Sequence, residues 1–181
     1  MDMYICLQVM DKIKSDMKSS DLWVSVDETT DQMGRNVANV FIGKLTSSQY
    51  NPPYLVECSF LDKTDSGTVA RLVNHSLQLL EDLQPERVKL LISDAAPYMI
   101  KCGSNLVIFY TSMAHLTCLA HALHRVCETI REMFSDVNSL ISSVKKVFLK
   151  APSRRQAYKD SFPDLCFPPE PIVTRLSLIH I

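Results

Sequence analysis

The sequence predicts an α/β fold in which a mixed β-sheet is flanked by helices and followed by a helical C-terminal segment. Two runs, LWVSVDETTD at 22–31 and VKLLISDAAPYM at 88–99, are apolar and end in an aspartate followed by small or turn-forming residues. Such runs are typical of buried strands. Segments with apolar side chains at three- and four-residue intervals precede, separate and follow them, as expected of helices that cover a sheet.

The first 61 residues predict one helix and three strands. Residues 3–17 have the apolar spacing of an amphipathic helix. A turn with Gly34 and a loop with Pro52 and Pro53 separate the strands that follow. The predicted strands are 22–27, 37–45 and 54–61. Because their connections are short, we expect an antiparallel meander.

Successive side chains of a strand point to opposite faces of the sheet, so each residue near Asp27 can be assigned to one face. Trp23 shares the face of Asp27, and both faces of a central strand in a helix-covered sheet are dry. We therefore expect Trp23 to be at least partly buried. If the strand continues past Asp27, Glu28 lies on the other face and is a poor second ligand.

The middle of the chain predicts a crossover to a parallel strand. Residues 65–68 (DSGT) supply N-cap candidates for a helix that extends to Leu83, and Pro85 follows it. The next strand, 88–93, is entered from a helix and should run parallel to a neighbour through a right-handed crossover. A short helix through about Gly103 and a short strand at 115–117 complete the sheet.

A long apolar stripe follows the last strand. Its residues are Leu116, Leu119, Leu123, Val126, Ile130, Met133, Val137, Leu140, Val144 and Val147. Alone, this spacing is typical of a coiled coil. We favour two packed helices that break near Ser135 and Asp136, because the stripe is wide. Beyond Pro152 the composition predicts an extended linker, so we divide the chain into a core at 1–150 and a basic, proline-rich linker and tail at 151–181.

Composition and charge exclude several classes of protein. Hydrophobic residues make up 46% and charged residues 22%, which is ordinary for a globular protein. A net charge of −1 gives no global attraction to nucleic acid. No apolar run approaches the roughly 20 residues of a membrane helix. The N-terminus lacks the features of a secretory signal, and the six scattered cysteines suggest reduced thiols, so we expect an intracellular protein.

Asp27 and Asp94 close the two strand-like runs. Acids at the C-terminal ends of buried strands lie where an α/β sheet opens to solvent and places its sites. In a sheet that pairs the two strands, the carboxylates repel each other unless they share a proton or hold a divalent cation. The alternative is that both aspartates only cap turns.

The order of elements resembles the ribonuclease H-like fold, in which the first and fourth strands are central neighbours; that would bring Asp27 and Asp94 together. Four motifs then resemble the hAT superfamily of transposases over nearly the whole chain. They are VSVDETTD, LLISDAAPYMIKCG, LTCLAHALHRV, and KKVFLKAP followed by PPEPIVTR.

The resemblance implies a site and an activity. Asp27 and Asp94 match the first two acids of the family's Asp-Asp-Glu triad, which binds Mg²⁺ or Mn²⁺ and cleaves and joins DNA in the nucleus. Cys118 and His121 match its CxxH motif, which supports the active site or lies near the DNA. The family's glutamate comes from a helix further downstream than this chain reaches, and Glu128 and Glu132 do not lie in a matching motif.

A cluster of cysteines and histidines and a stretch of basic residues each allow two interpretations. Cys118, His121, His124 and Cys127 are all possible zinc ligands, but their uniform spacing spreads them around a helix, so buried thiols and hydrogen-bonded imidazoles are the simpler interpretation. The basic stretch could contact DNA phosphates or form a solvated helix end. Its residues are Lys145, Lys146, Lys150, Arg154, Arg155 and Lys159.

We therefore expect a fragment of an hAT-like transposase catalytic core that is inactive alone. The alternative is a non-enzymatic, domesticated module that binds DNA or a protein partner, and a coiled-coil interaction protein is the third hypothesis. The family's zinc finger and dimerisation region have no counterpart in this sequence. The family pattern stops after Arg175, which suggests a truncation or an unrelated junction at Leu176.

Overall fold

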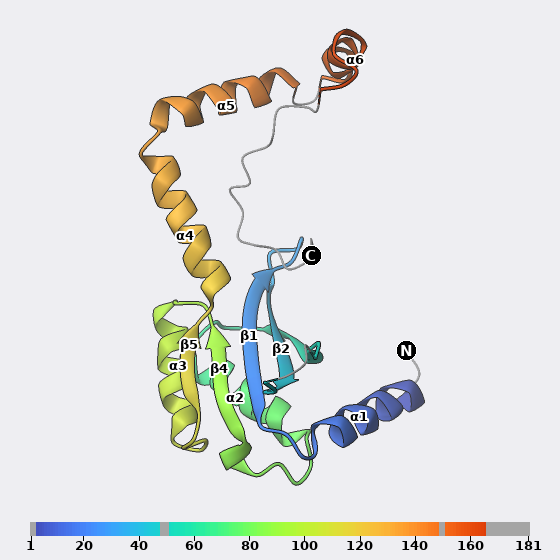
Figure 1. The fold of residues 1–181 in the computed structure, drawn as a ribbon, viewed down its shortest axis with the longest axis vertical. Helices are drawn as coiled ribbons and strands as arrows, with labels where there is room; N and C mark the ends of the chain where they lie inside the picture. Colours follow the sequence, from blue (N-terminus) through green and yellow to red (C-terminus); the bar gives the residue numbers. More distant parts are fainter. Residues whose placement is uncertain (1–2, 48–50, 149–150, 166–181) are drawn as a thin grey trace. The chain divides into compact units, whose positions relative to one another are not determined.

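The structure is a computed structural model that describes residues 3–47, 51–148 and 151–165 (Figure 1). Its elements are α1 (Met3–Met17), β1 (Leu22–Thr30), β2 (Asn36–Lys44), β3 (Tyr54–Leu61), α2 (Ser66–Gln78), the 3-10 helix η1 (Pro85–Arg87), β4 (Val88–Ser93), α3 (Pro97–Val107), β5 (Ala114–Thr117), α4 (Leu119–Glu132), α5 (Ser135–Phe148) and α6 (Pro152–Ser161). The chain divides into two compact units, 1–118 and 119–181, and each is described separately.

The first unit contains a five-stranded mixed sheet with the strand order β3-β2-β1-β4-β5. β1 pairs antiparallel with β2, and β2 pairs antiparallel with β3. β4 runs parallel to β1, and β5 runs parallel to β4. The predicted fold class is therefore confirmed: a three-stranded meander is extended by two parallel strands and flanked by helices.

One face of the sheet forms the hydrophobic core with α2 and α3, which Figure 1 draws behind and beside the central strands. The alternation predicted for β1 is confirmed, since Leu22, Val24 and Val26 are buried. They belong to a core that also includes Ile42 from β2, Leu91 from β4, Val69, Val73 and Leu77 from α2, and Met99 and Leu106 from α3. Each fully buried aliphatic side chain contributes about 1.5–3 kcal/mol through its removal from water.

The opposite face of the sheet differs from the prediction. Its side chains alternate with the core residues and are half-buried or exposed. They are Trp23, Phe41, Leu55, Phe60, Leu90, Ile92 and Leu116. Within the described part of residues 3–118, no helix lies over this face (Figure 1). Trp23 is therefore partly buried, as expected, but the premise that helices cover both faces of β1 is wrong for this unit.

Local side-chain bonds define the start and end of α2. The Asp65 carboxylate accepts hydrogen bonds from the backbone N–H groups of Gly67 and Thr68, which confirms the predicted N-cap. The bond from Thr68, followed by one from Lys63, lowers the pKa of Asp65 to about 2. α2 ends at Gln78, earlier than the predicted residue 83, because the chain turns there.

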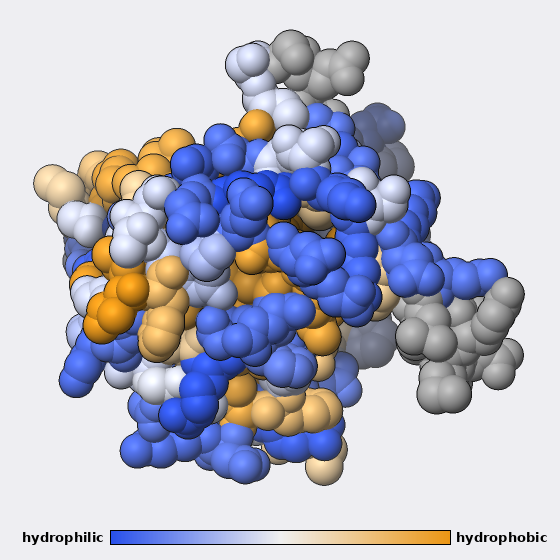
Figure 2. All heavy atoms as spheres, turned by 90° about the horizontal axis from the view of Figure 1, so that it is seen from below, coloured by the Kyte–Doolittle hydropathy of each residue, from blue (hydrophilic) through white to orange (hydrophobic). Residues whose placement is uncertain are grey.

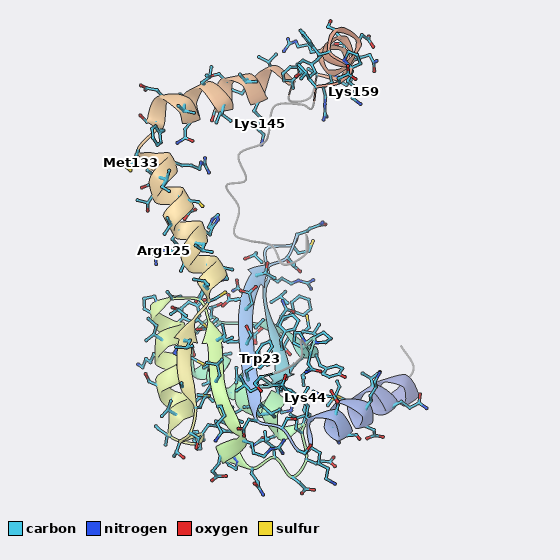
Figure 3. The ribbon with its side chains drawn as sticks, viewed as in Figure 1. Trp23, Lys44, Arg125, Met133, Lys145 and Lys159 are labelled. Carbon is cyan, nitrogen blue, oxygen red and sulfur yellow. The ribbon has the colours of Figure 1, made fainter. Side chains whose placement is uncertain are left out.

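The helix α1 is held against the lower end of the sheet. Lys44 of β2 (labelled in Figure 3) pairs with Asp16 at 2.7 Å and lowers the pKa of that carboxyl group. Arg87 donates to the carbonyl oxygens of Met17 and Ser20. These bonds connect α1 to the segments that lead into β1 and β4.

A cavity lies between the end of α1 and the segment before β4. Both charge signs line it, so it does not select for a ligand of one charge. Its lining includes Lys14, Lys18, Glu81, Asp82, Leu83 and Arg87. From below, Figure 2 shows apolar patches interrupted by hydrophilic side chains on this side of the molecule.

The second unit confirms the predicted break between two helices. α4 ends at Glu132 and α5 begins at Ser135, and the Asn138 side chain bridges the break by donating to the carbonyl oxygen of Arg131 at 2.5 Å. Neither helix contains a buried residue. The side chains of the apolar stripe are exposed, Met133 among them (Figure 3), except for Val144, which is half-buried.

The extended linker predicted beyond residue 152 is wrong at its start. Residues 152–161 form α6, whose first position is a proline, as helices tolerate. Tyr158 packs between Phe148 and Phe162, with ring centroids 5.3 and 5.5 Å away. The division of the chain at residue 150 remains a prediction. Among the helices that the structure describes, none is long and apolar enough to cross a membrane.

Candidate active site

Asp27 lies on β1, and Asp94 directly follows β4, the strand that runs parallel to β1. β1 and β4 pair in register at Val24 with Leu91 and at Ser25 with Ile92. Two residues further along, the same register reaches Asp27 and Asp94. Both carboxylates are half-buried. The register of the two strands therefore leads toward both predicted acids, although they lie 67 positions apart in the sequence.

The strand β1 does not end at Asp27, as the sequence suggested, but continues to Thr30. It continues because β2 pairs with it along its whole length, to Thr30 opposite Asn36. Glu28 therefore lies on the opposite face from Asp27, as expected for a continuing strand. Its carboxylate accepts hydrogen bonds from the Thr64 hydroxyl at 2.8 Å and the Tyr98 hydroxyl at 3.0 Å.

Asp94 follows β4 directly and begins the turn into α3. Its carboxylate accepts a hydrogen bond from the backbone N–H of Ala96 at 3.0 Å. Pro97 then starts α3, where a proline costs no hydrogen bond. Asp94 therefore has the turn-capping contact of the simpler interpretation, and this contact leaves its position opposite Asp27 unchanged.

A buried serine and a histidine lie beside Asp94, and sequence reasoning missed both. The Ser93 hydroxyl donates to the carbonyl oxygen of Asp94 at 2.9 Å and lies 2.9 Å from Nε2 of His115 on β5. Burial lowers the pKa of His115. A Cβ atom at Gly103 of α3 would lie 2.7 Å from Cγ of the ring. Gly103 was the one sequence signal that could have pointed to this contact, because a glycine inside a helix often marks close packing.

The residues present fit a divalent cation only loosely. Carboxylate oxygens are the ligands that Mg²⁺ and Mn²⁺ prefer, and Asp27 on β1 and Asp94 directly after β4 supply them. Over residues 3–47, 51–148 and 151–165, no three side chains of His, Cys, Asp or Glu gather where they could hold one ion. Two carboxylates need water to complete the roughly six oxygens of such a site.

The residues of the CxxH motif are placed as follows. Cys118 comes directly after β5, and its backbone N–H donates to the carbonyl oxygen of Ser93 at 2.7 Å. His121 lies at the start of α4. His124 pairs with Glu128 one turn later at 3.3 Å, and Cys127 is exposed. In the part of the chain that the structure describes, these side chains do not gather into a zinc site.

The basic residues flank the connection between α5 and α6. Lys145 and Lys146 lie in the last turn of α5, and Lys145 is labelled in Figure 3. Arg154 and Arg155 lie in the first turn of α6, where Arg154 donates to the carbonyl oxygen of Val147 at 3.0 Å. Lys150 lies outside the described residues. Lys159 lies in the last turn of α6. The described cations of this stretch thus lie near the ends of α5 and α6.

A family model described as a domain of unknown function, DUF659, matches residues 5–151. The chain belongs to the DUF659 family. DUF659 is the ribonuclease H-like region of hAT transposases, and the mixed five-stranded sheet is consistent with it. The resemblance is confirmed at this level, whereas the roles of Asp27, Asp94, Cys118 and His121 in the DUF659 fold remain predictions. No curated protein matches this DUF659 chain.

Proposed function

We propose that this DUF659 domain is part of the catalytic core of an hAT-like DNA transposase. In the complete protein, Asp27 and Asp94 hold Mg²⁺ or Mn²⁺ for cleavage and strand transfer of DNA in the nucleus. The observation that carries this proposal is the parallel register of β1 and β4, which leads to both acids. Bound divalent ions would stabilise the charge on the attacking and leaving oxygens of the phosphodiester.

The two carboxylates supply less than a complete site. With only two protein ligands the affinity for metal is low, and the ions are not fixed against the substrate. A further carboxylate is required for activity, and the 181-residue chain alone does not cleave DNA. Cys118 supports the site through its backbone bond to Ser93, next to Asp94.

Titration with Mn²⁺ tests this proposal through the paramagnetic broadening of NMR signals. We expect millimolar Mn²⁺ to broaden the amide signals around Asp27 and Asp94, and the substitutions D27N and D94N each to reduce the effect. D82N is the matched control, because Asp82 precedes β4 and an asparagine tolerates its positive φ of 60°. Signals at both acids that Mn²⁺ leaves unchanged would refute the metal site and favour the non-enzymatic module.

Five basic residues of the segment 145–155 are the proposed contacts to DNA phosphates. These residues are Lys145, Lys146, Lys150, Arg154 and Arg155. Fluorescence anisotropy with a labelled duplex should detect weak binding that fades between about 50 and 200 mM salt. Replacing the five residues by glutamine should abolish it. Binding that survives this change would place the DNA contact elsewhere.

A further inference from the structure

The carboxylate of Glu28 joins three segments around the two aspartates. It lies on β1 next to Asp27, and its two oxygens accept hydrogen bonds from different hydroxyl groups. Thr64 belongs to the loop before α2, and Tyr98 belongs to the first turn of α3, four residues after Asp94. All three of these side chains are half-buried. Hydrogen bonds to an ionised carboxylate are stronger than neutral ones, so this connection resists separation of the segments.

The pairing between β1 and β4 stops short of the two aspartates, although Asp27 still pairs with Asn39 of β2. The pairs between β1 and β4 end at Ser25 and Ile92, two residues before the acids. Two carboxylates in register repel each other, which favours separation of β1 from the turn that follows β4. The bond between Glu28 and Tyr98 connects the two segments just beyond the end of the ladder.

The contact at Tyr98 is transmitted to Asp94 through a short and well-bonded turn. The Asp94 carboxylate accepts from the N–H of Ala96, and the carbonyl oxygen of Ala96 accepts from the N–H groups of Met99 and Ile100. This turn and the start of α3 therefore move together. Holding Tyr98 against Glu28 also holds Asp94 against β1.

We propose that Glu28 is a positioning residue that, with Tyr98 and Thr64, holds Asp27 and Asp94 at the separation a divalent cation requires. This inference rests on the metal site proposed above. Glu28 does not bind the ion, because it lies on the opposite face of β1. Its effect on metal affinity therefore passes through the two hydroxyl groups, and removing either one reproduces the effect.

The Mn²⁺ affinity of charge-neutral variants of the 181-residue chain tests this inference. Y98F and T64V each remove one hydroxyl and leave every charge in place. We expect each to weaken Mn²⁺ binding by about tenfold, as is typical when the residues that orient metal ligands are lost. The matched control is Y110F, which removes a hydroxyl that donates to Asn74 at 2.9 Å. It should leave the Mn²⁺ affinity unchanged.

Urea unfolding without metal shows whether each variant is folded and how much stability it has lost. If Y98F and Y110F lose similar stability and only Y98F loses affinity, a merely structural role for Tyr98 is excluded. Unchanged affinity in both folded variants, Y98F and T64V, would overturn the inference. So would a loss of affinity seen with E28Q alone, since Glu28 would then act through its charge. Wild-type protein that binds no Mn²⁺ would instead overturn the proposed function, and this inference with it.

Discussion

Trp23 of β1 lies directly opposite Gly43 of β2, and its indole ring occupies the space where a side chain at position 43 would stand. A Cβ atom there would lie 2.6 Å from Cζ2 and from Nε1 of the ring. Real Cβ atoms do not approach other atoms so closely. The glycine is therefore required by the packing of the chain's single tryptophan (Figure 3).

The substitution G43A should destabilise the protein because it displaces this indole ring. Overpacking of this kind costs about 1–3 kcal/mol, which urea unfolding followed by Trp23 fluorescence would measure. The control is G67A in the first turn of α2, where the nearest atoms to the new Cβ lie at an ordinary 3.4 Å. Equal stability of G43A and wild type would show that the ring moves aside without cost.

The stability of the protein should decrease as the pH falls below about 6.5, in part because of His115. Burial lowers the pKa of this histidine in the folded state, so the unfolded chain binds the proton more readily. The contribution of His115 to the free energy of unfolding is therefore complete above the pKa of the unfolded chain, about 6.5. It is lost as the pH falls from there to the lower pKa of the folded protein. NMR titration of the imidazole signal should give a pKa below 6.5, and a value above 6.5 would contradict the buried position.

The substitution G103A should raise the pKa of His115. A Cβ atom at position 103 displaces the imidazole ring, breaks its contact with Ser93 and exposes it to water. Stability should fall by about 1–3 kcal/mol through overpacking. The same NMR titration, repeated on G103A, checks the shift, and an unchanged pKa would mean that α3 moves instead of the ring.

Cys102 should resist alkylation while the protein is folded. It is buried in α3, and burial raises the pKa of its thiol to about 12, so little thiolate exists at neutral pH. Cys58 and Cys127 are exposed and serve as internal controls. Iodoacetamide treatment followed by mass spectrometry should detect labels on the exposed pair first. Early labelling of Cys102 would indicate that α3 opens readily.

Removing both candidate ligands should stabilise the metal-free protein. D27N/D94N eliminates the repulsion between two carboxylates in register, which is worth up to about 1 kcal/mol at low salt. Added Mn²⁺ should raise the unfolding midpoint of the wild type only, since a ligand stabilises the state that binds it. Unfolding in urea with and without Mn²⁺ measures both effects, and equal metal-free stability would indicate that the carboxylates lie too far apart to repel.

The sequence by itself determined most of the elements before residue 149 and most of their bounds, whereas α6 was missed. Hydrophobic periodicity is a local property, so α1, β3, β4 and the break between α4 and α5 were predicted closely. Capping is local too, which is why Asp65 was identified as the start of α2. Even the parallel pairing of β1 with β4, which end near Asp27 and Asp94, followed from the order of elements, although only by resemblance to a known fold.

Only the tertiary structure decided which side chains meet across the sheet. Glu28 contacts Thr64 and Tyr98, which lie 36 and 70 positions away, and Ser93 contacts His115. Such contacts depend on strand register and on the angle at which α3 packs, and no local pattern encodes either one. The exposed face of the sheet beside Trp23 was missed for the same reason. The apolar sequence of a strand does not show whether helices cover one face of the sheet or both.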